Sequence, residues 1–333
     1  MNVFLSSEFE RYYEESPLVL VDVGARGGLQ PNWRQALEHL DIIGFEPDEE
    51  EYKALTKQTG KQATIYLNTG LYKEKASVNF YLTRSGGAAS LLEPDRSFLD
   101  RFPEPERFDV LKTLKLDVDT LDNQLKAQGL VDVDFIKLDT QGSELFILMG
   151  AEEVLTRSVF GLEIEVEFAP IYKDQPLFAE VDRFLRGLGF QLFDLRPCYW
   201  KRDAGKMYGK SKGQMIFGDA LYLRTPEALS SVVGAQSGPE NMKSKLLRTL
   251  SICVLYGYLD YALELFEGHR DLFNPHEIAA FMRSLQRSKA LVNRLPNFRG
   301  RGRIANIFYA IYKIINPSYK GWATGERVVG NLD

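Results

Sequence analysis

The stretch LVLVDVGARGGLQ, at residues 18–30, limits the possible folds of this chain more than any other feature. Its apolar start, LVLV, favours a buried strand. An acid and a turn with three glycines in five residues follow, and such a turn lets the backbone pass close to a ligand. The glycines lack the G-x-G-x-x-G spacing that cradles the pyrophosphate of a dinucleotide. The stretch is therefore typical of a nucleotide-binding fold, but for a ligand without that phosphate group.

Strand and helix patterns alternate from this stretch to residue 224. Apolar runs predict strands at 18–24, 41–47, 64–71, 133–139, 159–168, 191–195 and 218–224. Helical patterns fill most gaps, for example at 33–40, 49–58, 143–155 and 177–190. The alternation predicts an α/β fold with an open sheet of about seven strands, mostly parallel, with antiparallel pairing at the far edge. Residues 76–83 alternate like a half-solvated antiparallel strand, and the Gly-, Ser- and Pro-rich residues 84–108 predict an irregular loop.

The domain organisation is expected in three parts. Residues 1–224 form the α/β domain, the small and polar residues 225–238 are a linker, and residues 239–333 form a wholly helical C-terminal extension. The extension has 14 Lys and Arg against 8 Asp and Glu, a net charge of +6, so the rest of the chain has −11. This difference in charge indicates two regions whose surfaces have different functions.

Bulk composition excludes several classes of protein. The net charge of −5 argues against a nucleic-acid-binding chain. Cys198 and Cys253 lie far apart, which favours free thiols in a reducing compartment. Neither a signal peptide nor a membrane span is apparent, so we expect a cytoplasmic protein.

Polar residues stand at the carboxyl ends of successive predicted strands, where ligands bind in open α/β sheets. These residues are Asp22, Glu46, Asn68 to Gly70, and Asp139. Glu46 comes 22 residues after Gly24, a spacing that places a carboxylate on the two hydroxyls of a ribose. The turn and the acids together predict a nucleoside-type cofactor.

The motifs VDVGARGG, GFEPD, IKLDTQGSELFILMGAEEVL and LEIEVEF resemble, in order and spacing, the FkbM family of S-adenosylmethionine-dependent methyltransferases. The resemblance covers about residues 16–224 and implies a Rossmann-like class I methyltransferase sheet. S-adenosylmethionine has no phosphate, which agrees with the glycine spacing. The resemblance implies that the glycine turn passes beneath the methionine part, that Asp22 orients that part, and that Glu46 holds the ribose. The full set of implied cofactor residues is Asp22, Gly24, Ala25, Arg26, Gly28, Glu46, Pro47, Asp48, Asn68, Gly70, Leu71 and Asp139.

Methyl transfer to a hydroxyl needs alignment and removal of a proton. His39, His269 and His276 all lie outside the strand-end motifs, so a carboxylate is the better candidate for the base. Glu163, Glu165 and Glu167 alternate along one strand and should share one face, where burial requires cations, a metal, substrate or a partner such as Lys137. We expect Asp139 with Glu165 or Glu167 to be catalytic. A metal is possible, but no His or Cys set supports one, and no metal ligand is assigned.

Two segments have alternative interpretations. Residues 84–92, RSGGAASLL, are either a flexible flap over the site or a surface loop. The basic and aromatic tail, with Arg299, Arg301, Arg303, Lys313, Phe308, Tyr309 and Tyr312, is either an interfacial helix on anionic lipid or a packed helix. We favour packing, on the acidic domain or on a second subunit, because such stripes are usually buried.

The resemblance favours methylation of a hydroxyl on a sugar, a glycan or a related small molecule. The alternatives are an RNA or protein methyltransferase, a dehydrogenase, and a non-catalytic binding or assembly module on the same fold. No nucleic-acid partner is expected, whereas peripheral membrane contact and a homo-oligomer are open.

Overall fold

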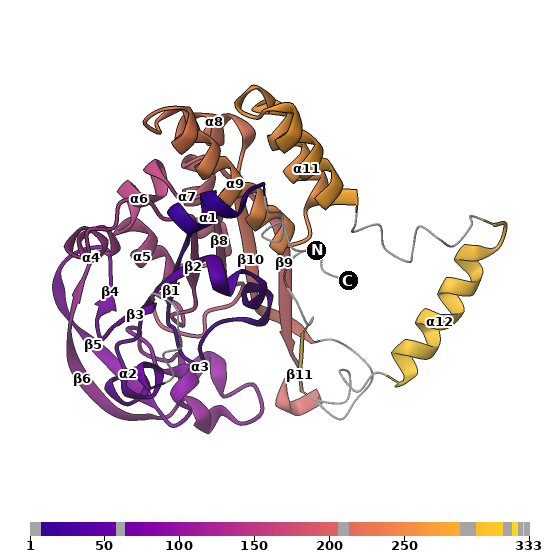
Figure 1. Cartoon of the computed structure of the whole chain (residues 1–333). Coiled ribbons are helices and arrows are strands. Elements are labelled where there is room, and N and C mark those ends of the chain that lie inside the picture. The colour runs from indigo at the N-terminus through magenta and orange to yellow at the C-terminus, as the bar shows by residue number, and fades with distance from the viewer. Residues whose placement is uncertain are drawn as a thin grey trace.

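The computed structural model describes residues 8–57, 64–205, 213–286, 298–315, 322–325 and 329. A central sheet lies between two layers of helices (Figure 1). Its strand order is β11-β9-β10-β8-β7-β1-β2-β3. The strands are β1 (Leu18–Val23), β2 (Leu40–Phe45), β3 (Thr64–Leu67), β7 (Phe135–Leu138), β8 (Gly161–Glu167), β9 (Phe190–Trp200), β10 (Gln214–Arg224) and β11 (Ala323–Gly325).

The pairing confirms the predicted α/β sheet. Strands β3, β2, β1, β7 and β8 run parallel. Strand β10 pairs antiparallel with both β8 and β9, so the reversal lies at the far edge, as expected. Strand β11 pairs antiparallel with β9 through Ala323–Gly325, so the prediction of a wholly helical extension is wrong at this point.

A second, three-stranded sheet of β4 (Gly70–Leu71), β6 (Val110–Asp119) and β5 (Ala76–Thr83) lies beside the first. Strands β5 and β6 pair antiparallel and are partly exposed, as predicted for residues 76–83. Strand β6 has mostly exposed side chains, and its weak apolar pattern did not predict it. The segment 84–108 is irregular apart from the short turns η3 (Gly86–Ala88), α3 (Arg96–Leu99) and η4 (Pro105–Phe108), in agreement with the predicted loop.

The two faces of the sheet bury alternate residues of each strand. Val21 and Ile43 face the layer of α4 (Leu121–Ala127), α5 (Glu144–Met149), α6 (Glu152–Arg157) and α7 (Phe178–Gly187). Leu20 and Ile42 face α1 (Glu10–Glu15), η2 (Pro31–His39), α9 (Pro239–Leu255), α10 (Leu259–Gly268) and α11 (Pro275–Gln286). The remaining helices are α2 (Glu49–Thr56), η5 (Asp203–Gly205) and η6 (Arg270–Leu272). The C-terminal helices thus complete the main core.

The predicted linker 225–238 is mainly a helix, α8 (Pro226–Gly234), so the prediction of a linker is wrong there. Thr225 caps the helix by accepting a hydrogen bond from the amide of Ala228, and Pro226 occupies its first turn. Leu229, Val232 and Val233 are buried. The small and polar residues that suggested a linker form the exposed side of this helix.

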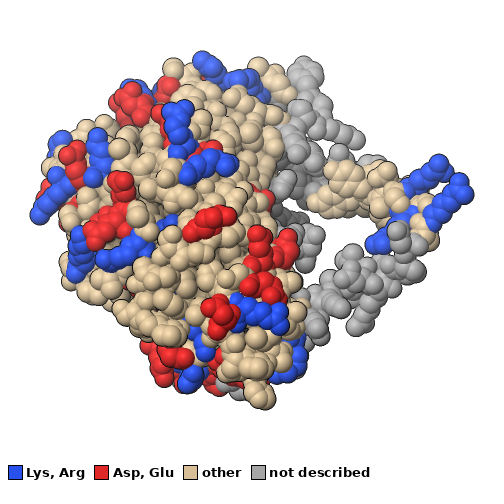
Figure 2. Space-filling view, turned by 90° about the horizontal axis from the view of Figure 1, so that it is seen from above, with Lys and Arg blue, Asp and Glu red and all other residues tan. Residues whose placement is uncertain are grey.

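Helix α12 (Arg301–Ile315) projects away from the rest of the chain (Figures 1 and 2). Its side chains from Gly302 to Tyr312 are exposed. The preferred expectation is therefore wrong for packing on the acidic domain of the same chain, and packing on a second subunit stays a prediction. No helix in the described ranges has both the length and the apolar content needed to cross a membrane.

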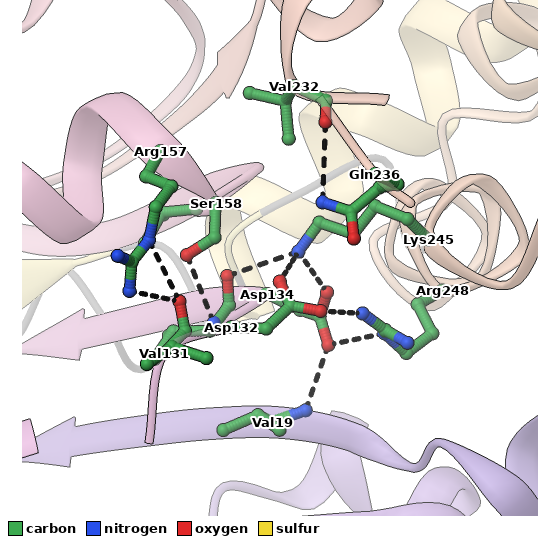
Figure 3. A network of polar contacts seen from close by, with 12 residues as sticks. Val19, Val131, Asp132, Asp134, Arg157, Ser158, Val232, Gln236, Lys245 and Arg248 are labelled. Carbon is green, nitrogen blue, oxygen red and sulfur yellow. Dashed lines mark hydrogen bonds and ion pairs between the residues drawn. The ribbon is translucent and has the colours of Figure 1, made fainter. Parts of the chain in front are cut away.

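Buried ion pairs fix α9 to the loop before β7 (Figure 3). Lys245 contacts Asp132 at 2.6 Å and Asp134 at 2.7 Å. The Nε atom of Arg248 lies 2.9 Å from Asp134, which also accepts a hydrogen bond from the amide of Val19 on β1. One cluster of four charged side chains thus joins the helical extension to two neighbouring strands.

Candidate active site

The backbone amides of the glycine turn after β1 form hydrogen bonds within the protein. Gly24, Gly27 and Gly28 have positive φ angles between 75° and 81°. The amides of Gly24 and Ala25 donate to the carbonyl of Phe45, and the amide of Gly28 donates to the carbonyl of Ala25. A Cβ on Gly24 would lie 2.0 Å from the carbonyl oxygen of Asp139, so glycine lets the ends of β1 and β7 meet. Because these three amides are already bonded, the turn does not offer them as a phosphate cradle.

Glu46 is buried at the end of β2, with 6% of its surface exposed. Its Oε1 accepts a hydrogen bond of 2.9 Å from the amide of Asp48. Asp48 in turn caps α2 by accepting from the amides of Glu50 and Glu51. The Asn68 side chain donates to the carbonyls of Glu46 and Pro47, which holds the end of β2 in place. Burial raises the pKa of Glu46 to about 7.

Gln141 connects the carboxylates at the ends of β7 and β8. Its Nε2 donates to Oδ1 of Asp139 at 2.9 Å and to Oε1 of Glu165 at 2.8 Å. The hydroxyl of Tyr172 donates to its Oε1 at 3.2 Å. The backbone of Gln141 is left-handed, with a φ of 59°. This turn directs one amide group between two acids, a role that the sequence did not reveal.

Three buried glutamates form a cluster behind Gln141. Oxygen atoms of Glu144, Glu165 and Glu167 all lie within 4.8 Å of one another. Glu144 accepts hydrogen bonds from the amide and hydroxyl of Thr140, whereas Ser143 does not cap α5 with its side chain. Burial, reinforced by the neighbouring acids, raises the pKa values of Glu165 and Glu167 well above the ordinary range. Carboxylates grouped in this way can bind a divalent cation, and the absence of an assigned metal ligand stays untested.

The third predicted strand acid, Glu163, lies on the same face of β8, as the alternation required. Its two oxygens accept from Gln30 at 2.9 Å and from Tyr256 at 2.8 Å. Lys137, named as its conceivable partner, instead lies 3.3 Å from Asp22. Glu163 is therefore satisfied by neutral donors from the layer that contains η2 and α9.

A cavity opens at the carboxyl ends of β1, β2 and β7. It encloses about 880 Å³ of empty space, including its opening to solvent. Eight predicted residues line it: Gly24, Arg26, Glu46, Pro47, Asp48, Gly70, Leu71 and Asp139. The cavity thus brings together most of the predicted cofactor residues, from the ends of three strands of the central sheet and from β4 of the second sheet.

The other predicted residues lie beside the cavity and are not among those that line it. Asp22 is buried against Lys137, and Ala25, Gly28 and Asn68 shape the adjoining turns. Glu165 and Glu167 lie behind Gln141, so Asp139 is the predicted catalytic carboxylate that faces the cavity. None of the three histidines lines it.

Residues of the 84–92 segment form one wall of the cavity: Gly86, Gly87, Ala89, Ser90 and Leu91. The position agrees with the flap interpretation, although closure itself is untested. Arg26 lies between this wall and α2, because its guanidinium pairs with Glu51 and a Cβ on Gly86 would lie 2.4 Å from it. Arg26 therefore lies at the wall of the cavity and is not simply a solvated side chain.

Several residues that line the cavity were not predicted from the sequence. Val23, Phe45, Phe80 and Ile147 supply apolar surface, and Thr140 and Gln141 supply polar groups. Val23 and Phe45 could have been found as the last apolar residues of their strands. Phe80 comes from β5, whose place beside the cavity depends on the second sheet, so no local signal identified it.

Comparison with known proteins decides the family. The model of the methyltransferase FkbM domain matches residues 22–192, slightly more than half of the chain. The chain belongs to the FkbM methyltransferase family. The FkbM assignment makes S-adenosylmethionine the cofactor of this methyltransferase, and its sheet is of the class I type. A comparison with curated proteins finds no significant match.

Several solved structures are similar at low identity to this FkbM methyltransferase. An S-adenosylmethionine-dependent methyltransferase from Listeria monocytogenes has 11% identity and a TM-score of 0.34, over 66% of this chain and 98% of that one. Magnesium protoporphyrin IX methyltransferase from Synechocystis PCC 6803 has 11% identity and a TM-score of 0.33, over 66% and 77%. A TehB-like methyltransferase from Corynebacterium glutamicum has 10% identity and a TM-score of 0.30, over 65% and 86%.

Proposed function

We propose that this FkbM methyltransferase transfers the methyl group of S-adenosylmethionine to a hydroxyl oxygen of a sugar, a glycan or a related small molecule. One observation carries the proposal. A single cavity has the buried carboxylate of Glu46 on one wall and the carboxylate of Asp139 on another. The first suits the two hydroxyls of a ribose, and the second suits the proton of an acceptor hydroxyl.

The residues of the cavity suit the donor in shape and charge. Val23, Phe45, Leu71 and Ile147 provide apolar surface for the adenine and the methionine chain. The lining has three acids (Glu46, Asp48 and Asp139) and one base, Arg26. This excess of negative charge complements the positively charged sulfonium and ammonium groups of the donor, and Arg26 can face its carboxylate.

When bound, S-adenosylmethionine supplies a methyl group that is already activated by its positively charged sulfur. The protein then has to align the acceptor and remove one proton from it. Asp139 accepts that proton on its carboxylate. Gln141 is a positioning residue, because its amide holds Asp139 and Glu165 at once.

The sugar class is supported by the family resemblance and by the charge of the cavity. A polyanion such as RNA is best bound where Lys and Arg gather. Among the described residues that line the cavity, Arg26 is the only basic one. A neutral acceptor with hydroxyl groups fits this acidic cavity better than a polyanion does.

Calorimetric titration of the full chain with S-adenosylmethionine tests the donor. We expect saturable binding that Glu46→Gln weakens roughly ten- to a hundredfold, since a hydrogen bond to a buried charged group contributes about 1.5–3 kcal/mol. Glu49→Gln is the matched control, because Glu49 is an exposed acid three residues away. Folded protein that binds no donor would support the non-catalytic alternative, and binding of NADH would support a dehydrogenase.

The acceptor is tested with donor that carries a labelled methyl group. Purified enzyme is incubated with monosaccharides, cell-surface glycans, RNA and protein fractions in parallel. We expect label in the sugar or glycan fraction, attached through oxygen as shown by mass spectrometry. Label only in RNA or in protein would overturn the proposed acceptor but leave the donor assignment standing.

A further inference from the structure

Helix α12 exposes an apolar stripe. Ile304, Ile307, Phe308, Ile311 and Ile315 are between 45% and 70% exposed. Their spacing of three or four residues places them along one side of the helix. A soluble domain rarely leaves so many large apolar side chains together on its surface without a binding role.

The sequence on both sides of this stripe is strongly basic. Residues 278–325 contain nine Lys and Arg and no Asp or Glu. Arg299 and Arg303 are exposed beside the first turn of α12, and Figure 2 shows blue side chains without red ones on the projecting segment. Positive charge at a helix N-terminus opposes the helix dipole, so these arginines do not serve helix stability.

We propose that α12 binds flat on the surface of an anionic lipid bilayer, with its apolar stripe among the acyl chains and its arginines on the headgroups. An amphipathic helix with a basic end and aromatic residues beside its apolar face suits that boundary, and Tyr312 lies beside the stripe. The helix has 15 residues, fewer than the roughly 20 that a membrane span requires. A second copy of the chain is a poorer partner, because two segments without acids repel each other.

The chain that follows α12 connects the lipid-binding helix to the segment beside the cavity. Ile315 and Trp322 are seven residues apart, so they lie at most about 25 Å from each other. Trp322 donates to Glu104 at 3.3 Å, and Arg107 stacks over its ring at 4.6 Å. Both belong to the 84–108 segment, whose first part forms a wall of the cavity. A bilayer bound by α12 would thus lie near the segment that covers the active site.

Co-sedimentation of the full chain with lipid vesicles tests the inference without any need for methyl transfer. We expect binding at low ionic strength to mixed phosphatidylcholine and phosphatidylglycerol vesicles, and little binding to phosphatidylcholine alone. Phe308→Asp should abolish it. Leu111→Asp is the matched control, because Leu111 on β6 is 62% exposed and Phe308 is 66% exposed. Arg299→Gln with Arg303→Gln should weaken binding roughly 30-fold, at about 1 kcal/mol for each arginine.

Three outcomes would overturn the inference. The wild type stays in solution with anionic vesicles, or it binds both vesicle types equally, or Phe308→Asp binds as well as the control. A concentration-dependent dimer in sedimentation velocity that is lost in Phe308→Asp, without vesicle binding, would assign the stripe to a second copy instead.

Discussion

In the proposed contact of Glu46 with the ribose, donor binding must overcome the effect of burial, which favours the neutral acid. Its pKa of about 7 means that about half of the side chains are protonated at neutral pH. The ionised form offers both of its oxygens as charged acceptors to the two ribose hydroxyls and so binds them more strongly than the neutral acid does. Binding of S-adenosylmethionine should therefore strengthen as the pH rises through this value.

We predict that donor affinity increases roughly tenfold between about pH 6 and about pH 8. Calorimetric titration at several pH values measures the change. In Glu46→Gln, which cannot ionise, this contribution should vanish. A wild-type profile that matches the profile of the variant would show that Glu46 does not contact the donor.

Gln141 gives a second prediction at the scale of a single residue. In Gln141→Asn the side chain is one methylene shorter and cannot reach both Asp139 and Glu165, whereas asparagine tolerates the left-handed backbone at this position. We expect kcat to fall roughly ten- to a hundredfold, less than the roughly 10²- to 10⁴-fold that a general base contributes in full, with unchanged affinity for the donor.

The pH–rate profile separates this positioning role from a structural one. Loss of a hydrogen bond to the charged form raises the pKa of a carboxyl, so the acidic limb of the Gln141→Asn profile should move to higher pH. An unmoved limb together with a lower melting temperature would indicate that Gln141 only supports the fold.

Among the elements, α9 shows how far a helix can depend on distant partners. Burial alone would raise the pKa of Asp134, but Arg248 and Lys245 outweigh it and hold this pKa below its ordinary value. Lys245 is fully buried, so its removal takes away one of the two cations that balance the buried charge of Asp134. Breaking a buried pair in this way costs about 3–5 kcal/mol.

We therefore predict that Lys245→Met lowers the free energy of unfolding by about 3–5 kcal/mol. The matched control is Lys126→Met, which removes an exposed pair with Glu153 and should cost less than about 1 kcal/mol. Urea unfolding followed by circular dichroism measures both. Equal effects of the two variants would contradict the inferred role of the α9 network.

Some elements could be predicted from the sequence because their signals are local. The continuous apolar runs of β1, β2, β7 and β8 and the acid after β2 required no knowledge of partners. The helix α8 had local signals as well, with Thr225 and Pro226 at its start, but its small and polar composition favoured a linker. From the sequence, the charged residues of α9 look like surface residues. Their partners Asp132 and Asp134 lie more than 100 residues earlier, and only the fold brings them together.

The same limit applies to the site. The place of Glu46 and Asp139 beside one cavity was predictable, because ligands bind at the carboxyl ends of strands in this type of sheet. The link from Gln141 to Glu165 depends on a left-handed turn and on the neighbouring strand, 24 residues further along. The prediction that α12 packs on the domain used a rule that holds for most apolar stripes, and it was wrong because this stripe is exposed.

At the scale of the whole molecule, buried acids determine how stability depends on pH. Burial raises the pKa of Glu144 to about 7 and that of Asp219 to about 6, and it raises the pKa values of Glu165 and Glu167 well above their ordinary value. In the unfolded chain these groups have ordinary values near 4. Between the unfolded and the native pKa values of these groups, the native state therefore binds more protons than the unfolded state. The free energy of unfolding falls as the pH rises through this interval. Asp134, whose pKa is lowered, acts in the opposite direction but only in the acidic range.

We predict that the free energy of unfolding of the chain without ligand decreases by at least about 1 kcal/mol from pH 5.5 to about pH 8. Glu165→Gln with Glu167→Gln should flatten this dependence and be more stable than the wild type at the higher pH, because a neutral amide replaces a charge that burial disfavours. Urea titrations at each pH measure both effects. A wild type that becomes more stable over this range would show that the cluster is neutralised by a bound cation, and added chelator would then restore the predicted slope.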